Sequence, residues 1–221
     1  MLKKLFIIPY FGEFPRWISQ YMWHIKHLAK YGYEFLITQD LADFVSRAKK
    51  YLDIDVGIEP GTSKSHDLRS AFGLMYQDKL DGYDYWGITD LDCVYGNIPH
   101  FMTDEELSVL DIWSNHHNYI CGPWTLFKNT EEINRLFEKF PGWRGLMSDI
   151  NNPNPGRWTE QEYSAIVDRE HESGSINRKY TFFQGKDPSI TDNLSLKGDE
   201  LFEGQDQIMT FHFNRTKEWP L

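Results

Sequence analysis

The chain has 221 residues, of which 40% are hydrophobic and 16% aromatic, and its formal net charge is −10 at pH 7. This length suits one domain with a sizeable core, and the apolar content argues against disorder. The negative charge disfavours long contact with a nucleic-acid backbone. Two cysteines, Cys93 and Cys121, supply neither a disulfide framework nor a zinc-binding spacing. With no signal peptide and no apolar run near about 18 residues, we expect a cytoplasmic protein.

The amino-terminal part of the sequence predicts a strand, a helix and a second strand. The apolar run over residues 5–8 is typical of a buried strand and stops at Pro9. Apolar residues then recur at helical spacing over residues 17–29, and Gly32 is the expected stop. Residues 34–38 form the second expected strand. This order predicts a βαβ unit and hence a parallel sheet.

The next segment predicts a helix over residues 41–52, a short strand within 53–59 and a helix over 65–80. Asp40 follows the second strand. Its side chain either contacts a nucleotide or caps the N-terminus of the following helix. Asp67 and Arg69 stand near the start of the helix over 65–80. A helix N-terminus beside a cation can hold an anion or a base edge.

Residues 83–97, YDYWGITDLDCVYGN, form the most informative stretch of the chain. Strand-type residues run up to Asp90 and predict a central strand that is covered on both faces. Asp90 and Asp92 would then lie at the strand end where α/β sheets bind ligands. Successive strand side chains point to opposite faces, so both carboxylates meet one ion only if the chain bends, and the turn at Gly96 and Asn97 indicates such a bend. The alternative is a pair of solvated turn aspartates.

The carboxyl-terminal half predicts shorter elements. A capping box at residues 103–106 opens one short helix, and residues 129–132 cap another that runs to 140. Strands are expected within 111–114 and 119–127. Residues 141–157 predict a long loop of the kind that forms lids or binds acceptors. Residues 159–162 predict a capping box. Residues 207–213 predict one strand with Ile208, Thr210 and His212 on one face.

Four segments together carry a resemblance to a known family. They are the opening strand–helix–strand with its PYFG, and the segments WGITDLDCVYGNI, CGPWTLFKNTEEI and FHFNRTKEW. The chain resembles the GT-A-fold glycosyltransferases, above all small bacterial and phage-borne proteins with a W-G-x-x-D-x-D-x-x-Y-G-x-I core, and more distantly the glycogenin and lipopolysaccharide galactosyltransferase group. The resemblance covers residues 5–219. It implies an α/β, Rossmann-like fold with a mixed, mostly parallel central sheet flanked by helices, in a single domain over 1–221. The nucleotide-binding half would be about 1–97 and the acceptor-binding half about 98–221.

The resemblance also implies a metal site. Asp90 and Asp92 would match the D-x-D motif, and His212 would match the histidine that completes the site. Carboxylate oxygens suit Mg²⁺ or Mn²⁺, and the imidazole makes Mn²⁺ the better match.

Further positions match residues that hold the nucleotide or the reacting sugar. Seven residues are expected to bind the UDP-sugar: Pro9, Tyr10, Asp40, Asp67, Arg69, Asp90 and Lys217. Glu218 stands where the family has proline after that lysine. Glu160, Gln161 and Glu162 are similar to the D-Q-D motif of retaining galactosyltransferases and would face the anomeric carbon, although Glu162 also fits as a capping-box partner. An inverting enzyme would use a carboxylate here as general base, so the stereochemical outcome stays open.

The implied activity is metal-dependent transfer of a sugar from a UDP-sugar to a saccharide, a lipid-linked acceptor or a modified base of phage DNA. The setting would be the cytoplasm of a bacterium or a phage-infected host, with attachment to the membrane surface left open. One alternative is a phosphatase of the haloacid dehalogenase type, with Asp90 as nucleophile and Asp92 as general acid. In that class the motif normally lies on the first strand, whereas here two strand–helix units precede it. Another alternative is a catalytically silent module that binds nucleotide sugars or glycans.

Overall fold

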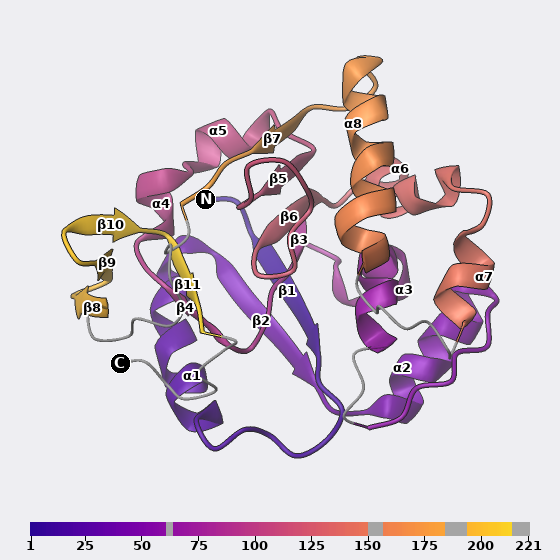
Figure 1. Ribbon diagram of the computed structural model, residues 1–221, viewed down its shortest axis with the longest axis horizontal. Helices are drawn as coiled ribbons and strands as arrows, with labels where there is room; N and C mark the ends of the chain where they lie inside the picture. Colours follow the sequence, from indigo (N-terminus) through magenta and orange to yellow (C-terminus); the bar gives the residue numbers. More distant parts are fainter. Residues whose placement is uncertain (61–63, 150–156, 184–193, 214–221) are drawn as a thin grey trace.

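A computed structural model describes residues 1–60, 64–149, 157–183 and 194–213 of the chain. At its centre is a mixed sheet of six strands in the order β2-β1-β3-β6-β5-β7 (Figure 1). The strands are β1 (Lys4–Pro9), β2 (Tyr33–Thr38), β3 (Tyr85–Ile88), β5 (Ile112–Ser114), β6 (Thr125–Lys128) and β7 (Arg178–Tyr180). β1 runs parallel to β2 and β3, and β5 runs parallel to β7, while β6 is antiparallel to β3 and β5. The prediction of an α/β fold with a mostly parallel central sheet is confirmed.

Five of these six strands therefore point in one direction, and their carboxyl ends share one edge of the sheet. Only β6 runs the other way. Loops that leave this shared edge lie next to each other in space even where they are far apart in the sequence, and this edge is where open α/β sheets bind ligands.

Along the first half of the chain, helices alternate with the strands β1, β2 and β3. They are α1 (Ile18–His24), η1 (Ile25–Tyr31), α2 (Leu41–Arg47), η2 (Ala48–Leu52), η3 (Lys64–Ala71), α3 (Phe72–Met75) and η4 (Gln77–Lys79), where η denotes a 3₁₀ or π helix. The three predicted helices are confirmed, each as consecutive shorter pieces, and Gly32 ends η1 in the left-handed conformation, at φ 79°. The strand predicted within 53–59 is wrong. Ile54 and Val56 alternate into the core, but this segment pairs with no strand of the described sheet.

The second half contributes short helices as well. They are α4 (Ile98–Phe101), α5 (Asp104–Ser108), α6 (Glu131–Asn134), η5 (Leu136–Lys139), α7 (Trp143–Ser148), η6 (Trp158–Tyr163) and α8 (Ser164–Glu172). Thr103 caps α5 and Thr130 caps α6 through their side-chain oxygens, as the sequence indicates. The capping box at 159–162 is wrong. Thr159 lies buried inside η6, which starts at Trp158, and its hydroxyl donates to the carbonyl of His66. In the segment 119–127, only the part from Thr125 onward is a strand.

Two small sheets complete the fold. β4 (Cys93–Tyr95) pairs with β11 (Thr210–His212), while β8 (Leu194–Lys197), β9 (Glu200–Glu203) and β10 (Asp206–Ile208) form a separate meander. The single strand predicted over 207–213 is thus wrong, because it divides at Met209 into two strands of different sheets. The Met209 amide donates to the carbonyl of Phe183, and its carbonyl accepts from Gly96.

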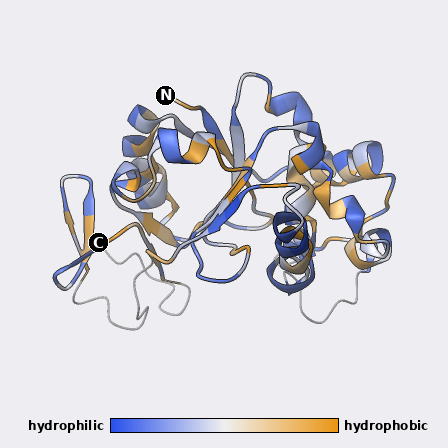
Figure 2. Cartoon of the chain, turned by 90° about the horizontal axis from the view of Figure 1, so that it is seen from above, coloured by the Kyte–Doolittle hydropathy of each residue, from blue (hydrophilic) through white to orange (hydrophobic). Residues whose placement is uncertain are grey.

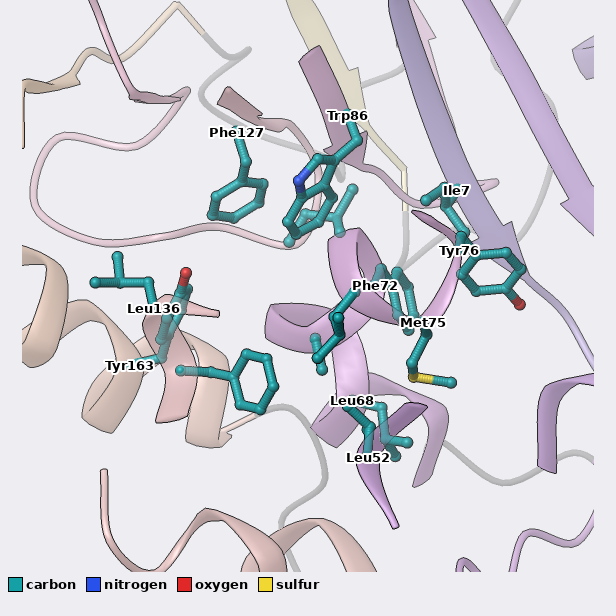
Figure 3. Packing of buried hydrophobic residues seen from close by; sticks show 14 of the residues in the cluster. Ile7, Leu52, Leu68, Phe72, Met75, Tyr76, Trp86, Phe127, Leu136 and Tyr163 are labelled. Atoms are coloured by element: carbon teal, nitrogen blue, oxygen red, sulfur yellow. The ribbon is translucent and has the colours of Figure 1, made fainter. Parts of the chain in front are cut away.

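The central sheet separates two hydrophobic cores. Along β1, Leu5 and Ile7 face one core while Phe6 and Ile8 face the other, as expected for alternating strand side chains. In the first core the rings of Trp86 and Phe127 stack with centroids 4.2 Å apart (Figure 3). The polar faces of the helices turn outward (Figure 2). Within the described residues, no helix combines the length and the apolarity that crossing a membrane requires.

Candidate functional site

Asp90, Asp92 and His212 come together at the edge where the parallel strands end. The chain leaves β3, turns at Leu91 and Asp92, and returns as β4, with Leu91 buried in the second core. Antiparallel pairing then places His212 of β11 opposite Cys93 of β4. As a result, His212 Nε2 lies 3.1 Å from Asp92 Oδ1 and 3.9 Å from Asp90 Oδ2.

The bend after the strand occurs earlier than the sequence suggests. It lies at Leu91 and Asp92 and not at Gly96 and Asn97. Gly96 has a different role, because a Cβ there would lie 2.8 Å from the carbonyl oxygen of Ile208 and 2.8 Å from Leu201 Cβ. The glycine therefore allows the meander to approach β4 closely.

Asp92 and His212 fit adjacent positions around one divalent cation, while Asp90 reaches His212 with one carboxylate oxygen at 3.9 Å and pairs with Arg69 through the other. Two ligands at right angles around an octahedral ion, each about 2.1 Å from it, are about 3.0 Å apart, close to the Asp92–His212 separation. The side chains of Asp90, Asp92 and His212 are 19%, 16% and 17% exposed, so they are sheltered but reachable. Cys93 also offers a ligand atom within 4.8 Å of those of Asp92 and His212. Burial raises the pKa of its thiol well above the usual value and disfavours the thiolate that a metal ligand requires, so we assign the site to the oxygen and imidazole donors.

A cleft of about 600 Å³ opens beside this cluster. Its walls come from the loop after β1, from η3, from the loop after β3 and from β11. The lining residues include Pro9, Tyr10, Phe11, Trp17, Ser65, His66, Arg69, Thr89, Asp90, Asp92 and His212. A second hollow of about 450 Å³ lies along β2 and contains none of the predicted site residues. The cleft therefore gathers Pro9, Tyr10 and Arg69 of the predicted nucleotide-binding set around the carboxylates.

Arg69 forms an ion pair with Asp90 through Nη2 and Oδ1. Gly122 leaves room for this guanidinium, because a Cβ at position 122 would lie only 2.3 Å from Arg69 Nη1 and 3.3 Å from Asp90 Oδ2. Sequence reasoning did not select Gly122. The one available signal was its place before Pro123 in the segment CGPW.

Two predicted nucleotide residues that the structure describes, Asp67 and Asp40, do not line the cleft. Asp67 is fully buried and pairs with Lys64, 2.9 Å away, because residues advance by about 120° along a 3₁₀ helix and Asp67 thus points away from Arg69. Asp40 is exposed and caps α2, accepting from the Asp43 amide at 2.9 Å. The N-cap alternative for Asp40 is thus confirmed. Lys217 lies outside the described residues.

Glu160, Gln161 and Glu162 are exposed residues of η6 and do not line the cleft. Gln161 Oε1 accepts from Arg157 Nε at 2.6 Å. Loss of solvation raises the pKa of Glu160, and the charge of Asp90 acts in the same direction, whereas Arg69 and His212 oppose it. Glu160 therefore lies within electrostatic reach of the cluster.

A buried hydroxyl network beneath the carboxylates was not predicted. Thr89 Oγ1 donates to the Pro123 carbonyl at 2.6 Å and lies 2.8 Å from the Tyr95 hydroxyl, which also donates to the Asp90 carbonyl. His24 Nε2 accepts from the Tyr95 amide at 2.9 Å, and burial lowers the pKa of His24 to about 3. These contacts fix the backbone that carries Asp90.

His66 is another cleft residue that sequence reasoning missed. Burial, reinforced by the charge of Arg69, lowers the pKa of His66 to about 4, so it is uncharged near neutral pH. Nothing in the sequence distinguishes it from the other histidines.

Comparison with solved structures supports the fold. A glycosyltransferase involved in the glycosylation of the major capsid of PBCV-1 is similar to this chain at a TM-score of 0.54 and 12% identity, covering 95% of this chain and 92% of the other. A putative glucose-1-phosphate thymidylyltransferase from Bacillus anthracis, in complex with a sucrose, is similar at 10% identity over 82% of this chain and 87% of the other. Its TM-score of 0.34 is too low to support an argument. A search of curated proteins finds no match.

The sequence itself matches one family model. Residues 35–152, more than half of the chain, match the model described as "Family of unknown function (DUF6625)". These residues include most of β2, all of η3, β3 with the two aspartates that follow it, and the segment containing Gly122. The chain therefore belongs to the family DUF6625.

Proposed function

We propose that this protein is a metal-dependent glycosyltransferase that moves a sugar from a UDP-sugar to a saccharide acceptor. The observation that carries the proposal is the convergence of Asp90, Asp92 and His212 beside one cleft at the ligand-binding edge of the sheet. The GT-A-like fold is compatible with this activity but does not by itself establish it. In this proposal the nucleotide-binding half is about 1–97 and the acceptor-binding half about 98–221.

The roles of the residues follow from their chemistry. Asp90, Asp92 and His212 would hold Mn²⁺, or Mg²⁺ as a weaker match. The bound cation supplies electrostatic stabilisation to the diphosphate that leaves the sugar. Arg69 keeps a second positive charge at the same place, and Lys217 is proposed to add a third. Pro9 and Tyr10 line the cleft where the nucleotide would lie, and the Tyr10 ring offers a face for uracil.

Glu160 is the carboxylate that we assign to the reacting sugar. Its raised pKa is caused by lost solvation and by Asp90. Whether Glu160 acts on the donor or takes a proton from the acceptor decides between retention and inversion, and either use requires the ionised form. Gln161 and Glu162 follow it on the same helix as supporting polar groups.

A donor panel tests the proposal. UDP release is measured with UDP-glucose, UDP-galactose and their N-acetylated forms, with Mn²⁺ and with a chelator. We expect Mn²⁺-dependent release by the natural protein and its loss in Asp92→Asn, with an unchanged circular dichroism spectrum. Asp206→Asn, which changes an exposed carboxylate on β10, is the matched control and should retain full activity.

This assay, a phosphatase assay and calorimetry together separate the alternatives. Full turnover by Asp92→Asn would show that the assignment of Asp92 is wrong. Robust hydrolysis of para-nitrophenyl phosphate without UDP release would favour a phosphatase. UDP binding in calorimetry without consumption of any donor would favour a silent binding module.

A further inference from the structure

Four aromatic rings gather on the surface next to the proposed site. His116, His117 and Tyr119 lie in the loop between β5 and β6, and Phe182 follows β7; together we call them the aromatic patch. The His116 ring stacks on Tyr119 and His117, with centroids 3.5 Å and 4.3 Å apart. Phe182 stands edge-on to both histidine rings and is 43% exposed, and His117 is exposed as well. The exposed rings of Phe182 and His117 therefore contribute little to the core, while His116 and Tyr119 are half-buried beneath them.

The aromatic patch lies on the same edge of the sheet as the carboxylates. β3, β5 and β7 run in one direction, so the loops after them emerge together. One strand, β6, separates β3 from β5, which puts the two loops about 10 Å apart at the usual strand spacing. Burial raises the pKa of Tyr119 and the charge of Glu160 adds to this effect, while Glu160 in turn interacts with Asp90. Glu160 is therefore coupled electrostatically to both clusters.

The position of the patch is held by a buried asparagine. Asn115 Nδ2 donates to Thr210 Oγ1 at 2.9 Å, on the strand that carries His212, and Asn115 Oδ1 accepts from the Phe183 amide at 2.8 Å. Ser114 Oγ donates to the Tyr119 carbonyl at 2.9 Å. These hydrogen bonds fix the loop to β11 and to the segment after β7. Because the loop is already ordered, it loses little conformational entropy when a ligand binds there.

Resting on the function proposed above, we propose that the aromatic patch is the acceptor subsite and stacks the apolar face of a pyranose ring. Aromatic rings bury the C–H face of a sugar, while ring nitrogens and hydroxyls bond its edge. Because the two loops are about 10 Å apart, a pyranose on the patch would lie beside the cluster formed by Asp90, Asp92 and His212.

A saccharide fits the patch better than a nucleic acid. None of the four residues is Lys or Arg. Burial, together with the neighbouring His117, lowers the pKa of His116 to about 4, so this ring is uncharged at neutral pH. The patch therefore offers little to a phosphate backbone, on a chain whose net charge is already −10.

Saturation-transfer NMR tests this inference without donor or metal. The probes are the methyl β-glycosides of glucose, galactose, mannose and N-acetylglucosamine, and an oligonucleotide that contains 5-hydroxymethyl-dC. We expect saturation of at least one glycoside, strongest on its ring C–H protons. Phe182→Ala and His117→Ala should weaken its binding about five- to tenfold. Trp23→Ala, which removes a 71% exposed ring on α1, is the matched control and should leave it unchanged.

Two results would overturn the inference. One is equal glycoside binding by the natural protein and by Phe182→Ala and His117→Ala, or no glycoside binding at all. The other is saturation of the oligonucleotide alone, which would assign the patch to a nucleobase. Failure of the donor panel is a separate result, because these NMR experiments contain neither UDP-sugar nor Mn²⁺.

Discussion

His212 and Asp92 are 120 positions apart in the sequence, yet the imidazole Nε2 of one lies 3.1 Å from a carboxylate oxygen of the other. The contact follows from the antiparallel pairing of β11 with β4, which places His212 opposite Cys93. A second link supports it, because the Phe213 amide donates to the Asp92 carbonyl at 2.9 Å. The cluster thus depends on a strand pair outside the central sheet.

Cation binding should stabilise the fold through this contact. Mn²⁺ at about a hundred times its Kd should add about 2.7 kcal/mol and raise Tm by about 5–10 °C. Replacing His212 by alanine removes one ligand and should abolish most of the shift. His100→Ala changes an exposed histidine on α4 and should leave the shift intact. Differential scanning fluorimetry measures both, and a full shift in His212→Ala would exclude His212 as a ligand.

Gly122→Ala should weaken UDP binding by displacing Arg69. The added Cβ would lie 2.3 Å from Arg69 Nη1, so the guanidinium must shift away from the position in which it pairs with Asp90. We expect UDP affinity to fall about tenfold, the size of one lost hydrogen bond to a charged group. Calorimetry on Gly122→Ala, Arg69→Ala and the double variant checks the cause, since the two effects should not add. Gly145→Ala, where a Cβ meets open space, is the control and should bind UDP normally.

Glu160 should set the acidic limb of the pH–rate profile. Its pKa is raised by lost solvation and by Asp90, and the ionised form is the active one, so activity falls as pH drops through that raised pKa. The fall should begin at a higher pH than an ordinary glutamate would give. With Mn²⁺ kept saturating, Glu160→Gln should lower kcat and remove this limb, whereas Glu162→Gln should retain it. An unchanged limb in Glu160→Gln would assign it to another group.

His24 should make the fold less stable in acid. The folded protein holds His24 neutral with a pKa of about 3, against 6.5 for the ordinary group, so below pH 6.5 the unfolded chain takes up the proton first. This contribution is complete above pH 6.5 and is lost at about 1.4 kcal/mol per pH unit as pH falls toward 3. His24→Gln keeps an acceptor for the Tyr95 amide but cannot be protonated. Denaturant unfolding from pH 7 to pH 4.5 should show a smaller decline for His24→Gln, and parallel declines would contradict this role.

Much of the fold was predictable because its strands and helices carry local signals. The apolar run at 5–8, the helical spacing over 17–29 and the strand before Asp90 each specify an element through neighbours in sequence. The alternating pattern at Ile54 and Val56 predicted a strand that is not there, because both side chains pack into the core although the segment pairs with no strand of the described sheet. The alternating pattern over residues 207–213 likewise predicted one strand, whereas the chain divides at Met209 into two short strands of different sheets.

The sequence by itself determined the residue types at the sheet edge: two carboxylates after a buried strand and a late histidine. The tertiary structure alone decided which side chains meet. Strand pairing brought His212 to Asp92, helix phase turned Asp67 toward Lys64 and Arg69 toward Asp90, and the parallel direction of β3, β5 and β7 put the aromatic patch on the same edge. Such contacts depend on long-range packing, which no local pattern encodes.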